Sequence, residues 1–245
     1  MNESNQELRP RIRQGKTFLD IPNNGKYITF VSPAVGPNNY LNNAKQLRKS
    51  DLTLPNGYNS ALLLEASYFP EDDAPEFQDV RQKMKNNWLN VYERVLWTLE
   101  GAYVVDDSEG EGLSVALKVG DLEKSLEGSS EIKGVRFSKD KKIRFAPRDR
   151  IKLGEQSAED LADEGLTIAT YMPEGAEKLS KVSTNLRNKP SVYGISAKDC
   201  KTPIQRVSAL LDYVFDGGRL VVGGLDFDGG DDGCAFGVSD SAEGA

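Results

Sequence analysis

Histidine is absent from this chain, and its absence excludes more chemistry than any other feature of the sequence. Without imidazole there is no Ser-His-Asp or Cys-His arrangement to activate a nucleophile. The zinc sites that need imidazole ligands are excluded as well, and so is the commonest general base near neutral pH. Any catalysis must therefore depend on carboxylates, lysine, tyrosine, a Ser-Lys pair or a metal held by oxygen ligands.

Cysteines are few and long apolar runs are missing. Cys200 and Cys234 are too few for a disulfide scaffold or a structural zinc site, and with no histidine to activate them we expect buried thiols. No apolar run approaches the roughly 18 residues that span a bilayer. No apolar segment follows the N-terminal charges as it would in a signal peptide. We therefore expect a soluble cytoplasmic protein that does not enter a membrane.

The composition is that of a globular chain. Its 245 residues are 38% hydrophobic and 28% charged, which is enough for a sizeable core. The net charge of −7 argues against nucleic acid as the default partner. We see no internal repeat and no linker. The sequence therefore predicts one domain over residues 25–238, a polar and mobile N-terminal arm over 1–24, and a C-terminal tail over 239–245.

Residues 75–107 give the clearest structural pattern. Apolar residues recur every three or four positions, as expected for one face of a helix: they are Phe77, Val80, Met84, Trp88, Val91 and Val95. Pro75 suits a first helical turn, and Gly101 ends the pattern. The spacing predicts one long amphipathic helix that continues into a short strand at residues 103–105, with both tryptophans in the core.

The rest of the chain alternates shorter elements. We predict helices at 38–49, at 57–69 with Asn56 as N-cap, and at 157–171 with a break at Pro173. Strands are predicted at 26–31, 113–119 and 150–153, with a hairpin joining 134–137 to 142–145. Residues 204–238 are interpreted as a β-meander, with a helix over 203–215 as the alternative. The predicted fold class is α+β, a mainly antiparallel sheet packed against the long central helix and several shorter helices.

The first candidate site is a glycine-rich acidic loop near the C-terminus. Its four carboxylates belong to Asp226, Asp228, Asp231 and Asp232. Oxygen ligands on a flexible backbone suit Ca²⁺ or Mg²⁺. The spacing departs from the EF-hand pattern, because Gly237 stands where the twelfth-position glutamate would be. A solvated hairpin loop explains the same residues, and the sequence requires no cofactor.

The second candidate is a basic segment around Phe137 and Phe145. Its cationic residues include Lys141, Lys142, Arg144, Arg148 and Arg150. Cationic strands with interleaved aromatic residues can bind phosphates and stack bases, as in RNA-binding surfaces. The acidic balance of the whole chain opposes this interpretation, and a solvated hairpin face is the alternative.

The third candidate is a set of carboxylates at the ends of the predicted strand, Glu100, Asp106 and Asp107. Carboxylates beside aromatic rings can act as general acid and base, or hold a metal ion for hydrolysis. The sequence gives no distance between them.

Three stretches carry a resemblance. They are LPNGYNSALLLEASY, the segment PEFQDVRQKMKNNWLNVYERVLWTLEGAYVVDD and the closing CAFGV. They resemble uncharacterised soluble proteins found in archaeal genomes. The resemblance implies an intracellular prokaryotic origin and carries no activity and no site residues.

The sequence leaves the function open between two classes. The first is a non-catalytic intracellular module that binds another protein through its charged surface. The alternative is a carboxylate-dependent hydrolase with a divalent metal, or a protein that binds RNA or another anionic partner through residues 139–152. The absence of histidine and of any catalytic motif favours the first.

Overall fold

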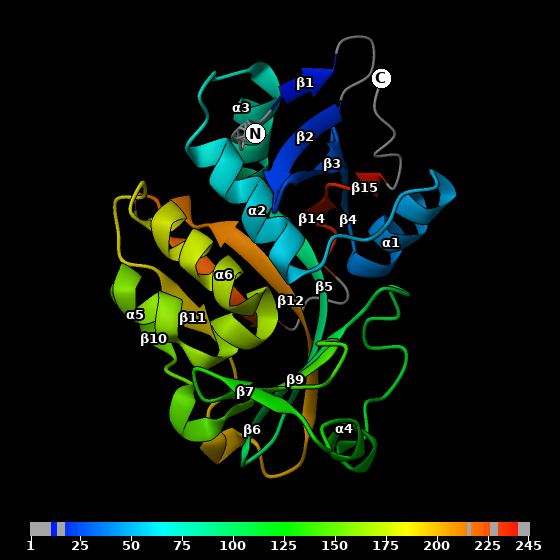
Figure 1. The fold of residues 1–245 in the computed structure, drawn as a ribbon, viewed down its shortest axis with the longest axis vertical. Coiled ribbons are helices and arrows are strands. Elements are labelled where there is room, and N and C mark those ends of the chain that lie inside the picture. Colours follow the sequence, from blue (N-terminus) through cyan, green and yellow to red (C-terminus); the bar gives the residue numbers. More distant parts are fainter. Residues whose placement is uncertain (1–10, 14–17, 215–216, 226–229, 240–245) are drawn as a thin grey trace, which may run out of the picture.

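The computed structural model describes residues 11–13, 18–214, 217–225 and 230–239. It confirms the α+β class: a large and mainly antiparallel sheet carries helices on its faces, and a smaller sheet lies beside it (Figure 1).

The large sheet runs in the order β10-β11-β13-β12-β5-β6-β9-β8-β7, with β14 joining β4 and β5 beside this path. Its strands, over the described residues, are β4 (Val35–Asn38), β5 (Trp88–Trp97), β6 (Gly101–Asp106), β7 (Ser130–Ile132), β8 (Val135–Phe137), β9 (Ile143–Pro147), β10 (Gly154–Glu155), β11 (Ser191–Tyr193), β12 (Ile204–Asp212), β13 (Leu220–Leu225) and β14 (Gly233–Ala235). The β11–β13 and β14–β5 pairs are parallel, and the other pairs are antiparallel. The hairpin predicted around residues 134–145 is confirmed as β8 and β9.

The small sheet has the order β1-β2-β3-β15. Its strands are β1 (Arg11–Arg13), β2 (Phe18–Asn23), β3 (Lys26–Val31) and β15 (Val238–Ser239). The strand predicted at 26–31 is confirmed. Residues 18–23, which the sequence assigns to the polar arm, form β2, and Leu19 and Ile21 enter the main core. Their alternation with Phe18 and Asp20 is the period of a strand.

The helices are α1 (Tyr40–Lys49), α2 (Gly57–Tyr68), α3 (Pro75–Asn86), α4 (Val119–Ser125), α5 (Ala158–Asp163) and α6 (Gly165–Ser183), with 3₁₀ turns at Arg148–Arg150 and Ala197–Asp199. Asparagine or serine side chains cap three of them. Asn39 caps α1, Asn56 caps α2 as predicted, and Ser157 caps α5.

The prediction of one long central helix is wrong beyond Asn86. α3 ends there, Asn87 is extended, and Trp88 begins the ten-residue strand β5. Because β5 is buried on both faces, seven of its ten residues are apolar. A run that is apolar on every side satisfies helical spacing by coincidence, and its β-branched and aromatic residues were the better indicator. Trp97 is fully buried, as expected, whereas Trp88 is only partly buried.

Two further elements differ from prediction. Residues 113–118 are irregular and do not form the predicted strand, and the predicted strand at 150–153 is replaced by a 3₁₀ turn that leads to β10. The helix predicted from residue 157 divides at Glu164, whose carboxylate caps the second part. Residues 204–212 form the strand β12 instead of the alternative helix, and β12 pairs with β13 as expected for the predicted β-meander. The meander does not continue, because β14 pairs with β4 and β5 and β15 pairs with β3.

The two faces of β5 have different coverings. Leu89, Val91, Val95 and Trp97 belong to the main core under α2, α3 and α6. The alternate residues Tyr92 and Leu96 pack on the other face, toward α1 and α4 respectively. Neighbouring residues of β5 therefore point into different environments, and this matters for Glu93 and Arg94.

Candidate functional site

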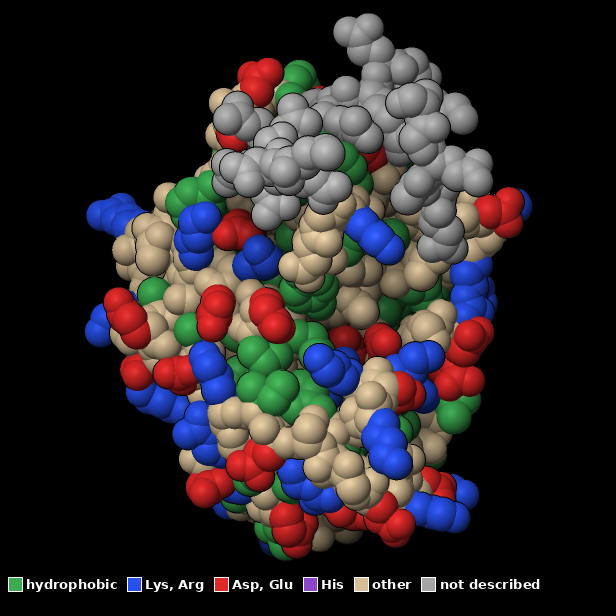
Figure 2. All heavy atoms as spheres, viewed as in Figure 1, with side chains coloured by type: hydrophobic (Ala, Val, Ile, Leu, Met, Phe, Trp, Pro, Cys, Tyr) green, Lys and Arg blue, Asp and Glu red, His purple; other side chains and the backbone are tan. Residues whose placement is uncertain are grey.

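A cleft of about 530 Å³ opens on the helix-bearing face of the large sheet. Four segments meet at it: the β2–β3 turn, the start of α2, the middle of α6, and the β8–β9 turn. Figure 2 shows this face, with acidic and basic side chains gathered around a recess near its centre. Glu93 on β5, Asp106 on β6 and Arg144 on β9 line the cleft.

Glu93 is the most buried carboxyl group of the cleft, with 1% of its side chain exposed. Its Oε1 accepts a hydrogen bond from the backbone N–H of Gly57 at 3.2 Å, and its Oε2 accepts one from Nη2 of Arg144. Arg144 is itself buried, and its Nη1 donates to the carbonyl of Lys141 at 3.0 Å. The pair therefore joins three segments of the chain at the base of the cleft.

A β-bulge accompanies Glu93. Val207 of β12 pairs with Arg94, but the next residue, Ser208, pairs with Val91, so Tyr92 and Glu93 are left out of the β5–β12 register. Bulges re-aim side chains and are frequent beside active sites. Here one of the two bulged residues, Glu93, lines the cleft together with residues of α6.

Gly57 allows α2 to begin against α6. A Cβ atom at this position would lie 1.8 Å from the carbonyl oxygen of Thr170, so no residue with a side chain fits without movement. This close approach brings the first N–H of α2 to Glu93.

Burial raises the pKa of Glu93 to about 8. Loss of hydration disfavours the charged carboxylate more than the Arg144 guanidinium and the Gly57 N–H favour it, and the charge of Asp106 adds to the increase. The carboxyl group at the base of the cleft therefore has a higher proton affinity than an ordinary glutamate.

Asp106 lies directly opposite Glu93 in the β5–β6 register. Opposed residues on one face of an antiparallel pair have Cβ atoms about 5 Å apart. Burial raises the pKa of Asp106 also, while Arg144 and Lys142 act in the opposite direction. Asp106 is partly exposed, whereas Glu93 is buried, so the two carboxyl groups differ in their access to solvent.

Met172 forms part of the cleft wall with a strained backbone. Its φ of 65° and ψ of 160° interrupt α6 just before Pro173. This combination is a region that residues with a side chain rarely occupy, and such strain is concentrated at functional sites.

The rim carries charges of both signs. Lys141 and Lys178 are its cations besides Arg144, and Asp140 and Glu174 its exposed acids. Lys178 is paired with Glu65, and Asp140 accepts hydrogen bonds from Ser138 and from the N–H of Lys142. A cleft of this lining suits a small polar ligand better than a strongly anionic one.

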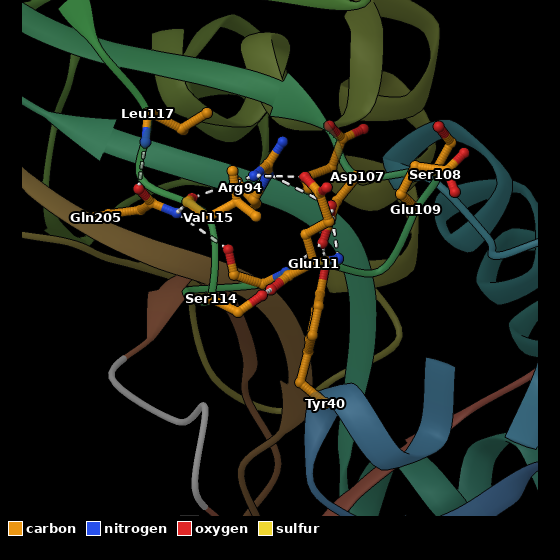
Figure 3. A network of polar contacts seen from close by, with 12 residues as sticks. Tyr40, Arg94, Asp107, Ser108, Glu109, Glu111, Ser114, Val115, Leu117 and Gln205 are labelled. Atoms are coloured by element: carbon orange, nitrogen blue, oxygen red, sulfur yellow. Dashed lines mark hydrogen bonds and ion pairs between the residues drawn. The ribbon is translucent and has the colours of Figure 1, made fainter. Parts of the chain in front are cut away.

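Asp107, one residue after Asp106, belongs to a closed network on the opposite face (Figure 3). Its Oδ2 accepts from the Tyr40 hydroxyl at 2.9 Å and from the Gly112 N–H at 2.8 Å; its Oδ1 accepts from the Glu111 N–H at 3.0 Å and lies 3.3 Å from Nε of Arg94. The side chain of Asp107 is 0% exposed. Its polar capacity is used, so Asp107 holds the loop after β6 and does not reach the cleft.

The remaining predicted residues do not gather at one place. Glu100 is exposed in the β5–β6 turn, at the other end of β6 from Asp106. Lys142 is exposed beside the cleft. Arg148 lies over the Trp97 ring at 5.5 Å and donates to the carbonyl of Ile195 at 2.9 Å, while Arg150 donates to the carbonyl of Asp163. Of the five basic candidates, the structure brings only Lys141 and Arg144 into the lining of the cleft.

The proposed cation loop is only partly described. Asp226 and Asp228 lie outside the described residues, whereas Asp231 and Asp232 are exposed ahead of β14. The carbonyl of Asp232 accepts from the Trp88 N–H at 3.1 Å. Within the described ranges, no group of three or more histidine, cysteine or acidic residues is placed to hold a metal ion.

Glu93 was not a predicted site residue. The helical interpretation placed it on a solvated face. The available signal was the Glu-Arg pair inside the apolar run WLNVYERVLW, because a charge in a buried strand needs a special environment.

No family model, curated protein or solved structure matches this chain. In the described part of the chain, no helix is long and apolar enough to cross a membrane.

Proposed function

We propose that this protein is a hydrolase that acts on a small polar substrate in the Glu93 cleft by acid–base catalysis. One observation carries the proposal: a buried carboxyl group with a pKa raised to about 8 lines an open cleft opposite a second carboxyl group. Paired carboxyl groups with different proton affinities are the usual equipment of general acid–base chemistry. The sequence alone favours a non-catalytic binding module over a hydrolase, and this proposal reverses that preference.

Each residue has a distinct role in this proposal. Glu93 is protonated at neutral pH and donates its proton to the leaving group. Asp106, the more exposed carboxylate, accepts a proton from the attacking water. Arg144 holds Glu93 in place and stabilises the carboxylate that forms when the proton leaves. No step in this scheme assigns a role to Ca²⁺ or Mg²⁺.

A specific observation favours a second candidate, a non-catalytic binding module. Glu93 already accepts hydrogen bonds from Gly57 and Arg144, so it can serve to shape the cleft without transferring a proton. A cytoplasmic location and a protein partner remain predictions of the sequence. Binding of RNA through residues 139–152 has the least support of these candidates, because Arg148 and Arg150 donate hydrogen bonds to backbone carbonyls of the protein itself.

The test is a substrate panel read at several pH values. Purified protein is assayed against nitrophenyl glycosides, esters, amides and phosphates between pH 4 and pH 10. We expect turnover of at least one class, with kcat/KM falling below the pKa of Asp106 and again above about pH 8, where Glu93 loses its proton.

Glu93→Gln keeps the shape and removes the proton donor, so activity should fall roughly 10²- to 10⁴-fold. Glu127→Gln, on an exposed residue after α4, is the matched control and should leave activity unchanged. Turnover that is equal in Glu93→Gln and wild type contradicts the catalytic role. A ligand that binds the cleft without turnover, and equally well in Glu93→Gln, supports the binding module instead.

A further inference from the structure

A second hollow lies on the opposite face of the large sheet, away from α2 and α6. It has a volume of about 580 Å³ and is formed over β11, β13, β12 and the start of β5. Ser191, Val221 and Leu211 lie side by side in the register of the first three strands and line it. Their neighbours Val222 and Leu210 do not line the hollow and belong to the main core. The hollow is therefore separate from the Glu93 cleft.

Tyr193 of β11 lines the hollow. Tyr193 is paired across the sheet with Gly223, which is in turn paired with Ala209. Tyr193 is 57% exposed, so a large part of this side chain is accessible to a ligand.

Two more aromatic residues line the same hollow. Tyr213 is 42% exposed, and Trp88 is partly exposed, in contrast to the fully buried Trp97. Aromatic side chains have a large apolar body and a polar tip, and they are costly to leave in water unless they serve a contact. Three of them in one hollow indicate a surface for ligands with apolar faces and polar edges.

The hollow continues past Trp88. A second one of about 210 Å³ shares Trp88, Leu211 and Tyr213 with it and is also lined by Lys85, Asn86 and Asn87. Together they form an elongated groove, which we call the Trp88 groove. The amide side chains of Asn86 and Asn87 offer both donors and acceptors at this end.

The charge of the groove argues against a polyanion. Among the described residues that line its two parts, the cations are Lys85 and Arg219 and the acids are Glu155, Asp212 and Asp232. Arg219 is paired with Glu155. Nucleic acids need an excess of cations to meet their phosphates, and no such excess is present among these residues because Asp212 is buried and the remaining two acids balance the two cations.

We propose that the Trp88 groove binds a neutral oligosaccharide. The apolar C–H faces of sugar rings pack on aromatic rings, while their hydroxyl groups exchange hydrogen bonds with amides and carboxylates at the edge. A concave groove of this size is typical of a ligand site, whereas a flat protein interface needs about 800 Å² on each partner. The elongated form suits two or more linked rings.

The experiment uses the full chain and defined probes. A glycan array that carries neutral glucans, xylans, mannans, galactans and N-acetylated glycans is screened first. The trisaccharide of the bound class is then titrated while tryptophan fluorescence is recorded, since Trp88 is the partly exposed indole. We expect saturable binding that weakens at least tenfold in the double variant Tyr193→Ala/Tyr213→Ala, whose melting temperature should stay near wild type because both rings are exposed.

Two controls separate the groove from other sites. Phe69→Ala removes an exposed aromatic ring at the end of α2, on the opposite side of the sheet, and should bind the glycan like wild type. Glu93→Gln should also bind normally, so failure of the acid–base proposal leaves this inference intact. The inference is overturned if no neutral glycan binds, if the double variant binds equally well, or if only sulfated glycans or nucleic acids bind. It is also overturned if the tyrosines instead mediate a concentration-dependent dimer in analytical ultracentrifugation.

Discussion

Glu93 and Arg94 are neighbours on β5, and Asp106 and Asp107 are neighbours at the end of β6. In each pair one residue faces an open cleft and its neighbour faces a closed polar network. On one face, Arg94 and Asp107 form a closed network with Tyr40 and the loop after β6. On the other face, Glu93 and Asp106 line an open cleft. The same residue types thus serve two purposes, and their surroundings decide which.

The difference lies in how fully each carboxyl group is supplied with donors. Asp107 receives three hydrogen bonds and lies beside the Arg94 guanidinium, so both of its oxygens have partners. Glu93 receives one backbone N–H and one guanidinium hydrogen bond and is equally buried. A buried carboxyl group with too few donors retains its proton, and a proton held beside an open cleft is available for chemistry.

The largest effect should come from breaking the closed network. Asp107→Ala leaves Arg94 buried without its main partner and frees the loop after β6, so we expect a loss of about 3–5 kcal/mol of unfolding free energy. Urea denaturation followed by circular dichroism measures this loss. Glu111→Gln, which alters a half-exposed partner of the same arginine, should cost less than about 1 kcal/mol. Equal losses in the two variants would mean that burial of Asp107 is not decisive.

The next effect is a pH dependence that belongs to Glu93 alone. Its folded pKa of about 8 lies above its ordinary value of 4.5, so the folded state binds the proton more tightly than the unfolded state. Stability from this group is fully present below about pH 4.5 and is lost as the pH rises toward 8, at about 1.4 kcal/mol per pH unit.

Glu93→Gln removes this contribution. The stability of the variant relative to wild type should therefore increase steadily between pH 5 and pH 8, and Glu127→Gln should show no such trend. Parallel stability profiles for Glu93→Gln and wild type would place the pKa of Glu93 near its ordinary value.

A smaller effect is expected where α2 meets α6. In Gly57→Ala the new Cβ meets the Thr170 carbonyl, which forces the helices apart and should cost roughly 1–3 kcal/mol. Gly120→Ala in α4, where a Cβ meets nothing within 4 Å, is the matched control and should stabilise by up to about 1 kcal/mol. Thermal denaturation of both variants measures the contrast, and a neutral Gly57→Ala would show that the contact is loose.

The smallest effect sharpens the comparison at neighbouring positions. Burial raises the pKa of Asp106, so above that pKa the ionised carboxylate destabilises the folded state. Asp106→Asn should therefore increase stability slightly at neutral pH, by less than Glu93→Gln does at pH 8, whereas changes at Asp107 decrease it. Urea denaturation at pH 7 tests the sign, and a clear loss of stability in Asp106→Asn would assign Asp106 to a structural role.

Local signals in the sequence were sufficient for part of the fold. The Asn56 cap, the β8–β9 hairpin and the break before Pro173 each depend on a few adjacent residues. The strand from Trp88 to Trp97 could not be separated from a helix by spacing, because both of its faces are buried.

The candidate site was less accessible to sequence reasoning. Asp106 was named as a candidate general acid or base, Lys141 and Arg144 were named as parts of a basic surface, and the structure places all three at one cleft. Glu93 was missed because its role depends on contacts distant in sequence, with Gly57 and Arg144. The β-bulge in β5 and the close approach of α2 to α6 at Gly57 cannot be recognised from amino-acid composition or hydrophobic periodicity.

The most direct test is a titration of Glu93 itself. Protein labelled with ¹³C at the glutamate carboxyl carbon is followed by NMR from pH 4 to pH 10, and Glu93→Gln assigns the signal. The account predicts that the Glu93 carboxyl group loses its proton near pH 8. A signal that shows a fully ionised Glu93 across neutral pH, with a titration at or below 4.5, would contradict it.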